Sequence, residues 1–218
     1  PWKYAILENT PERVSVKLWT RPLRVPILIE KVLTLEAGKS TLFIEEKLTN
    51  EARTHLDLVW GQHIAFGLPF VKEGAKIYTN ARSFLAEPLM PPKRRFQPGV
   101  ETNFPAALNI NGKEDDASIV DPESAAPYSD MAYLYDFDDR AYYALKNEAK
   151  NVGFALRWDA RIFKCLWYWL ERYGTQDAPW WGDAYAVALE PWTNRWRPNP
   201  QEGIDAGEWL RLDAGEVL

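Results

Sequence analysis

A single carboxylate near the end of the chain, Glu190, lies in a segment that predicts a β-strand with one cleared face. Residues 184–191 alternate between small and large side chains, and neighbouring side chains of a strand point to opposite faces. The large residues at 185, 187 and 189 would face a core, while three alanines share the other face with Glu190. We expect Pro191 to end the strand because it lacks a hydrogen-bond donor. A hollow beside a carboxylate suits a sugar, and a solvated glutamate at a strand end fits the pattern equally well.

Tryptophan is the compositional outlier, with 11 residues among 218. A tryptophan is usually a partly buried core residue whose N–H needs a partner, so most of the 11 are expected to be structural. Flat aromatic faces also suit the C–H faces of a pyranose, and several indoles lie in or near the predicted strands. The ones that could bind a sugar are Trp167, Trp169, Trp180, Trp181 and Trp192.

A second segment that could carry chemistry surrounds His63, one of only two histidines. If residues 55–66 form one strand, His55 and His63 share a face, and Gly61 opens space beside His63. Two histidines and one cysteine cannot complete a metal site of the usual His and Cys type, so we expect no metal. We expect no other cofactor, because an acid and a base that act on one bound sugar need none. His63 is then either a hydrogen-bonded core histidine or a proton donor near neutral pH.

The elements that must position these residues are predicted to be short β-strands, because apolar and polar residues alternate with a period of two. Turn residues separate the segments, and helical periodicity is nearly absent. The weakly periodic stretch 89–127 is expected to be a long excursion over a sheet. The pattern predicts one all-β domain over residues 1–218, built as a sandwich or barrel. The predicted strands are 3–8, 13–20, 25–35, 40–49, 55–66, 131–137, 140–147, 152–159, 163–170 and 185–190.

One internal similarity bears on the ends of the chain. Residues 32–39 and 209–216 both read as a strand followed by an acidic-Ala-Gly turn. A second strand follows the first copy, whereas the chain stops at Leu218 after the second. The chain begins at Pro1 with strand-like sequence almost at once, so both ends are expected to be truncated within a larger sheet.

Charge and cysteine content narrow the class of protein. The net charge of −5 and the pI near 5.2 argue against nucleic-acid binding, which needs a basic stripe. One cysteine, Cys165, allows no internal disulfide and fits a reducing compartment. No apolar stretch reaches the roughly 20 residues of a membrane span, and no leader pattern precedes residue 30. We therefore expect a cytoplasmic protein without a membrane partner; the sequence leaves its oligomeric state open.

Two motifs resemble one known family. The segment Trp60-Gly-Gln-His-Ile-Ala-Phe-Gly67 resembles the histidine strand of the galactose mutarotase-like superfamily, especially of bacterial aldose 1-epimerase-related proteins. The segment Ala188-Leu-Glu-Pro-Trp-Thr193 resembles their glutamate motif. The order and the wide separation of the two motifs also match, and weaker similarity covers most of the chain.

The resemblance implies an antiparallel β-supersandwich, here without its N-terminal strands, and an isomerase that interconverts the α and β anomers of an aldose in carbohydrate metabolism. Glu190 would be the general base at the anomeric hydroxyl, and His63 would be the acid at the ring oxygen. Gln62 stands where many relatives have a second histidine and would contact the substrate. By position alone, Arg161 could bind a sugar hydroxyl or instead pair with Asp159.

Three readings of the function remain open. The first is an aldose 1-epimerase acting on a free or phosphorylated monosaccharide, and it requires His63 and Glu190 to face one site. The second is a non-catalytic carbohydrate-binding domain of the same fold, since the family's upstream histidine and arginine have no counterpart in this chain. The third is a scaffold domain, in which Glu190 would be tied up in a salt bridge, for example with Arg195.

Overall fold

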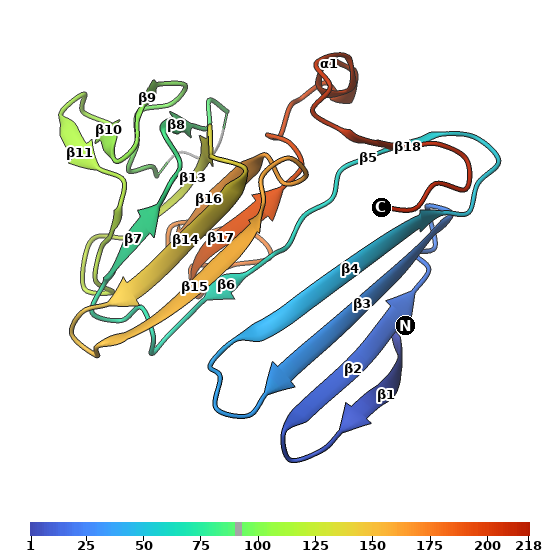
Figure 1. Cartoon of the computed structure of the whole chain (residues 1–218). Helices are drawn as coiled ribbons and strands as arrows, with labels where there is room; N and C mark the ends of the chain where they lie inside the picture. The colour runs from blue at the N-terminus through green and yellow to red at the C-terminus, as the bar shows by residue number, and fades with distance from the viewer. Residues whose placement is uncertain (90–92) are drawn as a thin grey trace. The chain divides into compact units, whose positions relative to one another are not determined.

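The computed structural model describes residues 1–89 and 93–218 (Figure 1). Contacts between Cα atoms divide the chain into two compact units. The first comprises residues 1–58 and 210–218, and the second comprises residues 59–209. Positions 90–92 of the predicted excursion lie outside the described residues.

The first unit is an antiparallel sheet of four strands in the order β1-β2-β3-β4. Cross-strand rows of aliphatic side chains run through it, as in the row Ile6, Val16, Leu33 and Ile44. A two-stranded ladder of β5 and β18 completes the unit. The strands are β1 (Lys3–Asn9), β2 (Arg13–Thr20), β3 (Ile27–Glu36), β4 (Leu42–Asn50), β5 (Leu56–Leu58) and β18 (Leu210–Leu212).

The repeated acidic-Ala-Gly sequence forms the same turn twice in this unit. Gly38 and Gly215 both have φ of 74°, a conformation that favours glycine. In the first turn the Lys39 N–H donates to the Glu36 carbonyl over 3.1 Å, and in the second the Glu216 N–H donates to the Asp213 carbonyl over 3.0 Å. The internal similarity in the sequence therefore corresponds to a shared local structure.

The second unit contains two larger antiparallel sheets. One has the strand order β6-β17-β16-β13-β8-β9, the other has the order β12-β7-β14-β15, and β10 and β11 form a separate hairpin. The strands are β6 (Ala65–Phe66), β7 (Ala75–Thr79), β8 (Ser83–Ala86), β9 (Glu101–Asn103), β10 (Ala106–Leu108), β11 (Glu114–Asp116), β12 (Ile119–Val120), β13 (Tyr128–Tyr135), β14 (Arg140–Asn147), β15 (Val152–Asp159), β16 (Cys165–Arg172) and β17 (Tyr185–Trp192).

The core of the second unit lies between its two sheets. Leu166 and Tyr168 from β16 pack in one cluster with Tyr143 and Leu145 from β14, and all four are fully buried. Burying a side chain of this size contributes roughly 1.5–3 kcal/mol. The predicted all-β antiparallel sandwich is thus confirmed. The strand bounds predicted for β2, β14 and β15 are those observed.

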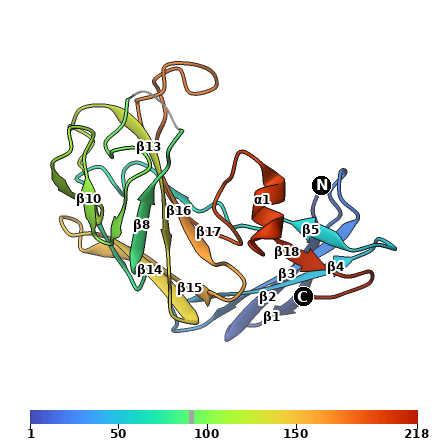
Figure 2. The same cartoon turned by 90° about the horizontal axis from the view of Figure 1, so that it is seen from above.

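Several predicted elements are corrected by the structure. The predicted strand 55–66 is wrong, because only its two ends are strands, β5 and β6, and they belong to different units. Pro191 does not end β17, which continues to Trp192. The short helix α1 (Pro200–Asp205), visible in Figure 2, and the strands β7 and β8 have no counterpart in the prediction. Among the described residues, no helix has the length and apolarity needed to cross a membrane.

Candidate functional site

Glu190 lies on the outer face of the six-stranded sheet. Its neighbours on β17, Val187 and Leu189, belong to the core cluster, so the alternation predicted from the sequence is confirmed. On the adjacent strand β16, Trp167 is directly opposite Glu190 and Trp169 is opposite Ala188. Ala188 is fully buried, Ala184 and Ala186 are half-buried, and none of the three lines the cavity, which lies over the neighbouring indoles instead.

Two side chains contact the Glu190 carboxylate. The indole Nε1–H of Trp192 donates a hydrogen bond of 2.9 Å to Oε2. The Nε2 atom of His63 lies 3.5 Å from Oε1. Burial raises the pKa of Glu190, and the Trp192 hydrogen bond and the nearby His63 only partly oppose that effect. A carboxylate with a raised pKa is a better proton acceptor, which suits a general base.

Trp192 is held in place from several sides. Its ring stacks on Trp167, with centroids 4.6 Å apart and planes inclined by 22°. The Nε1–H of Trp167 in turn donates to the Asn194 carbonyl over 2.7 Å. A Cβ atom on Gly61 would lie only 2.1 Å from the Trp192 ring. The space that Gly61 was expected to open beside His63 is therefore filled by the indole of Trp192.

The segment before β6 positions His63 by pairing with the end of β17. Gly61 forms an isolated bridge with Trp192. The Gln62 N–H donates to the Pro191 carbonyl over 2.9 Å, and the Leu189 N–H donates to the Ile64 carbonyl over 3.0 Å. These bonds place the imidazole of His63 beside Glu190 although the segment is not a regular strand. His55 belongs to the first unit, so the two histidines do not share a strand face.

His63 and Glu190 lie in one cavity of about 390 Å³. The sequence-predicted residues Trp167, Trp169 and Trp192 line it, as does Trp180. His63 meets Trp169 edge to face, with ring centroids 6.0 Å apart. The full lining is His63, Met131, Tyr133, Trp167, Trp169, Trp180, Glu190, Trp192 and Trp196.

Met131 and Tyr133 are functional candidates that sequence reasoning missed. Both are on β13, where they pair in register with Trp169 and Trp167 of β16. They form a small buried cluster on the outer face together with Cys165. The alternation through 131–135 indicates that residues 131 and 133 share one face of a strand. It does not reveal which strand pairs with this one, and so does not place these residues beside Trp167 and Trp169.

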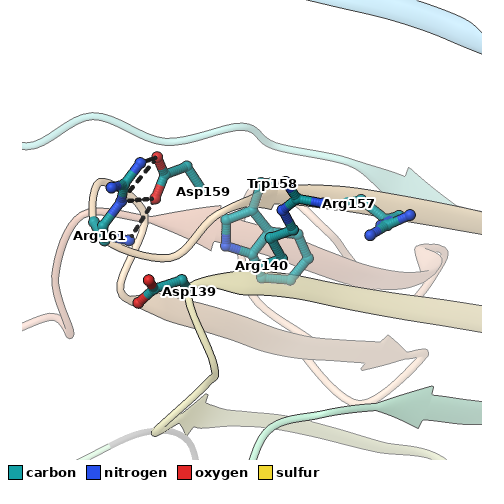
Figure 3. Close-up of a pocket in the computed structure, with 6 residues that line it drawn as sticks. All are labelled: Asp139, Arg140, Arg157, Trp158, Asp159 and Arg161. Atoms are coloured by element: carbon teal, nitrogen blue, oxygen red, sulfur yellow. Dashed lines mark hydrogen bonds and ion pairs between the residues drawn. The ribbon is translucent and has the colours of Figure 1, made fainter.

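Three predicted substrate-binding residues do not line this cavity. Trp181 is 71% exposed. Gln62 contributes its backbone N–H to β17 and is not part of the lining. Arg161 lines a different pocket, where it bonds Asp159 (Figure 3). That these three residues bind substrate stays a prediction.

Two further predictions concern a metal ion and a salt-bridge partner for the Glu190 carboxylate. No group of three His, Cys, Asp or Glu residues in the described part of the chain could hold a metal ion. Arg195, the expected salt-bridge partner in a scaffold domain, pairs with Glu208 at 3.6 Å. Glu190 contacts His63 and Trp192 instead, so the salt bridge to Arg195 that a scaffold domain would have is not observed.

Comparison with known structures gives the same fold. A Klebsiella pneumoniae protein named "putative aldose 1-epimerase" superposes with a TM-score of 0.64 at 15% identity, over 97% of this chain and 50% of that one. A galactose mutarotase related enzyme from Lactobacillus acidophilus gives a TM-score of 0.56 at 14% identity, over 99% and 68%. A TPR-domain containing protein from Parabacteroides distasonis gives 0.65 at 11% identity, over 100% and 33%.

At identities this low the superpositions establish the fold alone, and the chain spans about half the length of the Klebsiella protein. No curated protein matches the chain in sequence. The family model described as "Domain of unknown function (DUF4432)" matches residues 20–217. The chain therefore belongs to the DUF4432 family, and its fold is that of the galactose mutarotase-like proteins.

Proposed function

We propose that this chain acts as an aldose 1-epimerase, exchanging the anomers of a monosaccharide by acid/base catalysis. The observation that carries the proposal is the contact between Glu190 and His63, 3.5 Å apart in a cavity walled by indoles. One group is a buried carboxylate with a raised pKa, and the other is an imidazole that is 61% exposed. These properties support Glu190 as the base and His63 as the acid acting on one bound sugar.

The short separation of the two groups fits the chemistry of ring opening. The anomeric oxygen and the ring oxygen of an aldose are bonded to the same carbon, so the base and the acid must act at neighbouring atoms. Glu190 takes the proton of the anomeric hydroxyl while protonated His63 gives a proton to the ring oxygen, and the C1–O5 bond breaks. The open aldehyde rotates about C1–C2. The reverse transfers then close the ring and restore both groups.

The cavity supports the binding of one sugar ring. Indoles can stack on the C–H faces of a pyranose, and the stacked pair of Trp167 and Trp192 is fixed by its own contacts. A rigid wall loses little side-chain entropy when a ligand binds. The volume of about 390 Å³ is of the size that single small molecules occupy in proteins. The substrate, free or phosphorylated, is proposed only as a monosaccharide.

Proton exchange spectroscopy between the α and β anomeric signals of glucose and galactose tests this function. We expect the purified chain to accelerate exchange and Glu190→Gln to lower the rate by about 10²–10⁴-fold. Glu114→Gln is the matched control, because this substitution removes the same charge from an exposed residue of the β10–β11 hairpin. Equal rates for wild type and Glu190→Gln would exclude Glu190 as the base.

The composition of the lining favours a second function, that of a non-catalytic carbohydrate-binding domain. Seven of the nine lining residues are aromatic or methionine, and His63 and Glu190 are the other two. A wall of this kind can bind a sugar without reacting with it. Saturable sugar binding without faster anomer exchange would support the binding domain over the epimerase.

A further inference from the structure

A second pocket in residues 59–209, of about 580 Å³, lies where β14 begins and β15 ends (Figure 3). Its lining is Asp139, Arg140, Arg157, Trp158, Asp159 and Arg161. It is built on the four-stranded sheet, whereas Glu190 is on the six-stranded one. We propose that this pocket binds the oxyanion of a small molecule, a phosphate ester or a carboxylate, through Arg140 and Arg157. The inference does not rest on the proposed epimerase activity.

Arg140 and Arg157 are the first part of the argument. Among residues 1–89 and 93–218, neither guanidinium has an ion pair or hydrogen bond. By contrast, Arg161 in the same pocket is fully engaged with a carboxylate. Each free guanidinium presents a planar set of donors that matches carboxylate and phosphate oxygens.

The strand register brings the two arginines together. Arg140 is opposite Asp159, and Arg157 is opposite Tyr142, so the arginines are diagonal neighbours on adjacent strands. Diagonal pairs have Cα atoms roughly 7–8 Å apart, within reach of long side chains. Ala141 beside Arg140 is buried, and Leu156 and Trp158 on either side of Arg157 pack against the core, so the arginine side chains lie on the outer face of the sheet. Two like charges at this spacing repel, and an anion between them would reverse that energy.

The nearby carboxylates do not supply that anion. Arg161 bonds both oxygens of Asp159, with Nε–Oδ1 at 2.9 Å and Nη2–Oδ2 at 2.6 Å, as the dashed lines in Figure 3 show. This pairing lowers the pKa of Asp159. Asp139 is the remaining acid, and it is exposed. The lining holds three arginines and two aspartates, a net charge of +1 in a chain of net charge −5.

The size and composition of the pocket define the ligand class. A volume of about 580 Å³ exceeds what an inorganic anion fills, so the oxyanion should be one end of a larger molecule. Asp139 offers acceptor oxygens that suit the hydroxyl groups of such a molecule. Trp158 also lines the pocket, but its indole packs against the core beside Tyr143, and its N–H is bonded to the Phe163 carbonyl over 2.9 Å. The polar contacts to a ligand would therefore come from the arginines and Asp139.

Calorimetric titrations with inorganic phosphate and with acetate test the site, using the whole chain. We expect saturable 1:1 binding of at least one anion by the wild type, weakened about 10-fold or more in Arg140→Gln and in Arg157→Gln. Arg24→Gln is the matched control, an exposed arginine outside the pocket that removes the same charge. Preference for phosphate identifies a phosphate ester as the ligand class, and preference for acetate identifies a carboxylate.

Two further arms keep the result unambiguous. Glu190→Gln should bind the anion with the affinity of the wild type, because Glu190 is not part of this pocket. The anion site can therefore be tested whether or not the epimerase proposal holds. Glucose 6-phosphate and glucose are each titrated into the wild type and into Arg140→Gln. A loss of affinity in the variant for glucose 6-phosphate alone shows that a larger phosphate ester uses the same arginines. Absence of saturable binding of both anions, or equal weakening in Arg24→Gln, would overturn the proposed site. Circular dichroism of each variant confirms that the fold is retained.

Discussion

The indole N–H of Trp192 donates to the carboxylate of Glu190 over 2.9 Å, two residues away on the same strand. Both side chains lie on the outer face of β17, because residues i and i+2 of a strand share a face. The bond stabilises the charged carboxylate, whereas burial favours the neutral form. The pKa of the proposed base is thus raised by burial and lowered by Trp192 and His63, and the Trp192 contribution can be removed by a single substitution.

Trp192→Phe should shift the pH dependence of anomer exchange. The substitution keeps an aromatic ring on Trp167 but removes the N–H donor, so the pKa of Glu190 rises further. A base must be deprotonated to act, and activity is lost as pH falls through its pKa. The acid limb of the pH–rate profile is therefore expected to move to higher pH. Trp196→Phe is the control, since Trp196 lines the same cavity without bonding Glu190; an unmoved acid limb in Trp192→Phe would contradict the role.

Gly61→Ala should damage both stability and activity. The added Cβ would lie 2.1 Å from the Trp192 ring, so the indole must move. Overpacking of this kind costs typically about 1–3 kcal/mol. Urea unfolding measures the loss, and exchange spectroscopy measures the activity. Gly67→Ala is the matched control, because its Cβ would meet the Tyr185 carbonyl oxygen at 3.7 Å, an ordinary contact. Equal stability of the two variants would show that the indole relocates without cost.

Trp180→Ala should weaken sugar binding while Trp181→Ala leaves it unchanged. Trp180 lines the cavity and contacts Trp169 at a centroid distance of 5.3 Å, whereas Trp181 is 71% exposed. Loss of one stacking face is expected to cost about 0.5–1.5 kcal/mol, or a fall in affinity of about 2- to 12-fold. Titration of each variant with the best-bound monosaccharide checks this. A larger loss in Trp181→Ala would restore Trp181 as a binding residue.

Asp130→Ala should strongly destabilise the second unit. Asp130 is buried on β13, pairs with Arg94 at 3.2 Å and accepts backbone N–H bonds from Phe96 and Met131. Removing one partner of a buried pair leaves an uncompensated charge and costs about 3–5 kcal/mol. Denaturant unfolding measures the effect. Asp138→Ala, which removes an exposed ion pair with Arg82, is expected to leave the free energy of unfolding nearly unchanged; similar losses in both would refute the argument from burial.

The sequence predicted the strands of the fold better than the contacts of the site. Alternation alone was enough to give the bounds of β14 and β15 and the outward face of Glu190. It failed for residues 55–66, because an alternating pattern does not reveal that the chain leaves the strand at 59 and pairs with β17 instead. The register of β13 against β16, which brings Tyr133 to the cavity, depends on contacts between distant segments.

The missing side chain of Gly61 has a consequence for how this family can change over evolution. Because the Trp192 ring occupies that space, the two positions form one steric unit although they are far apart in the sequence. A mutation at either position alone should be deleterious, and a side chain at 61 should be tolerated only together with a smaller residue at 192. Correlated substitution of these two columns across DUF4432 proteins would record which members have kept the indole beside the carboxylate.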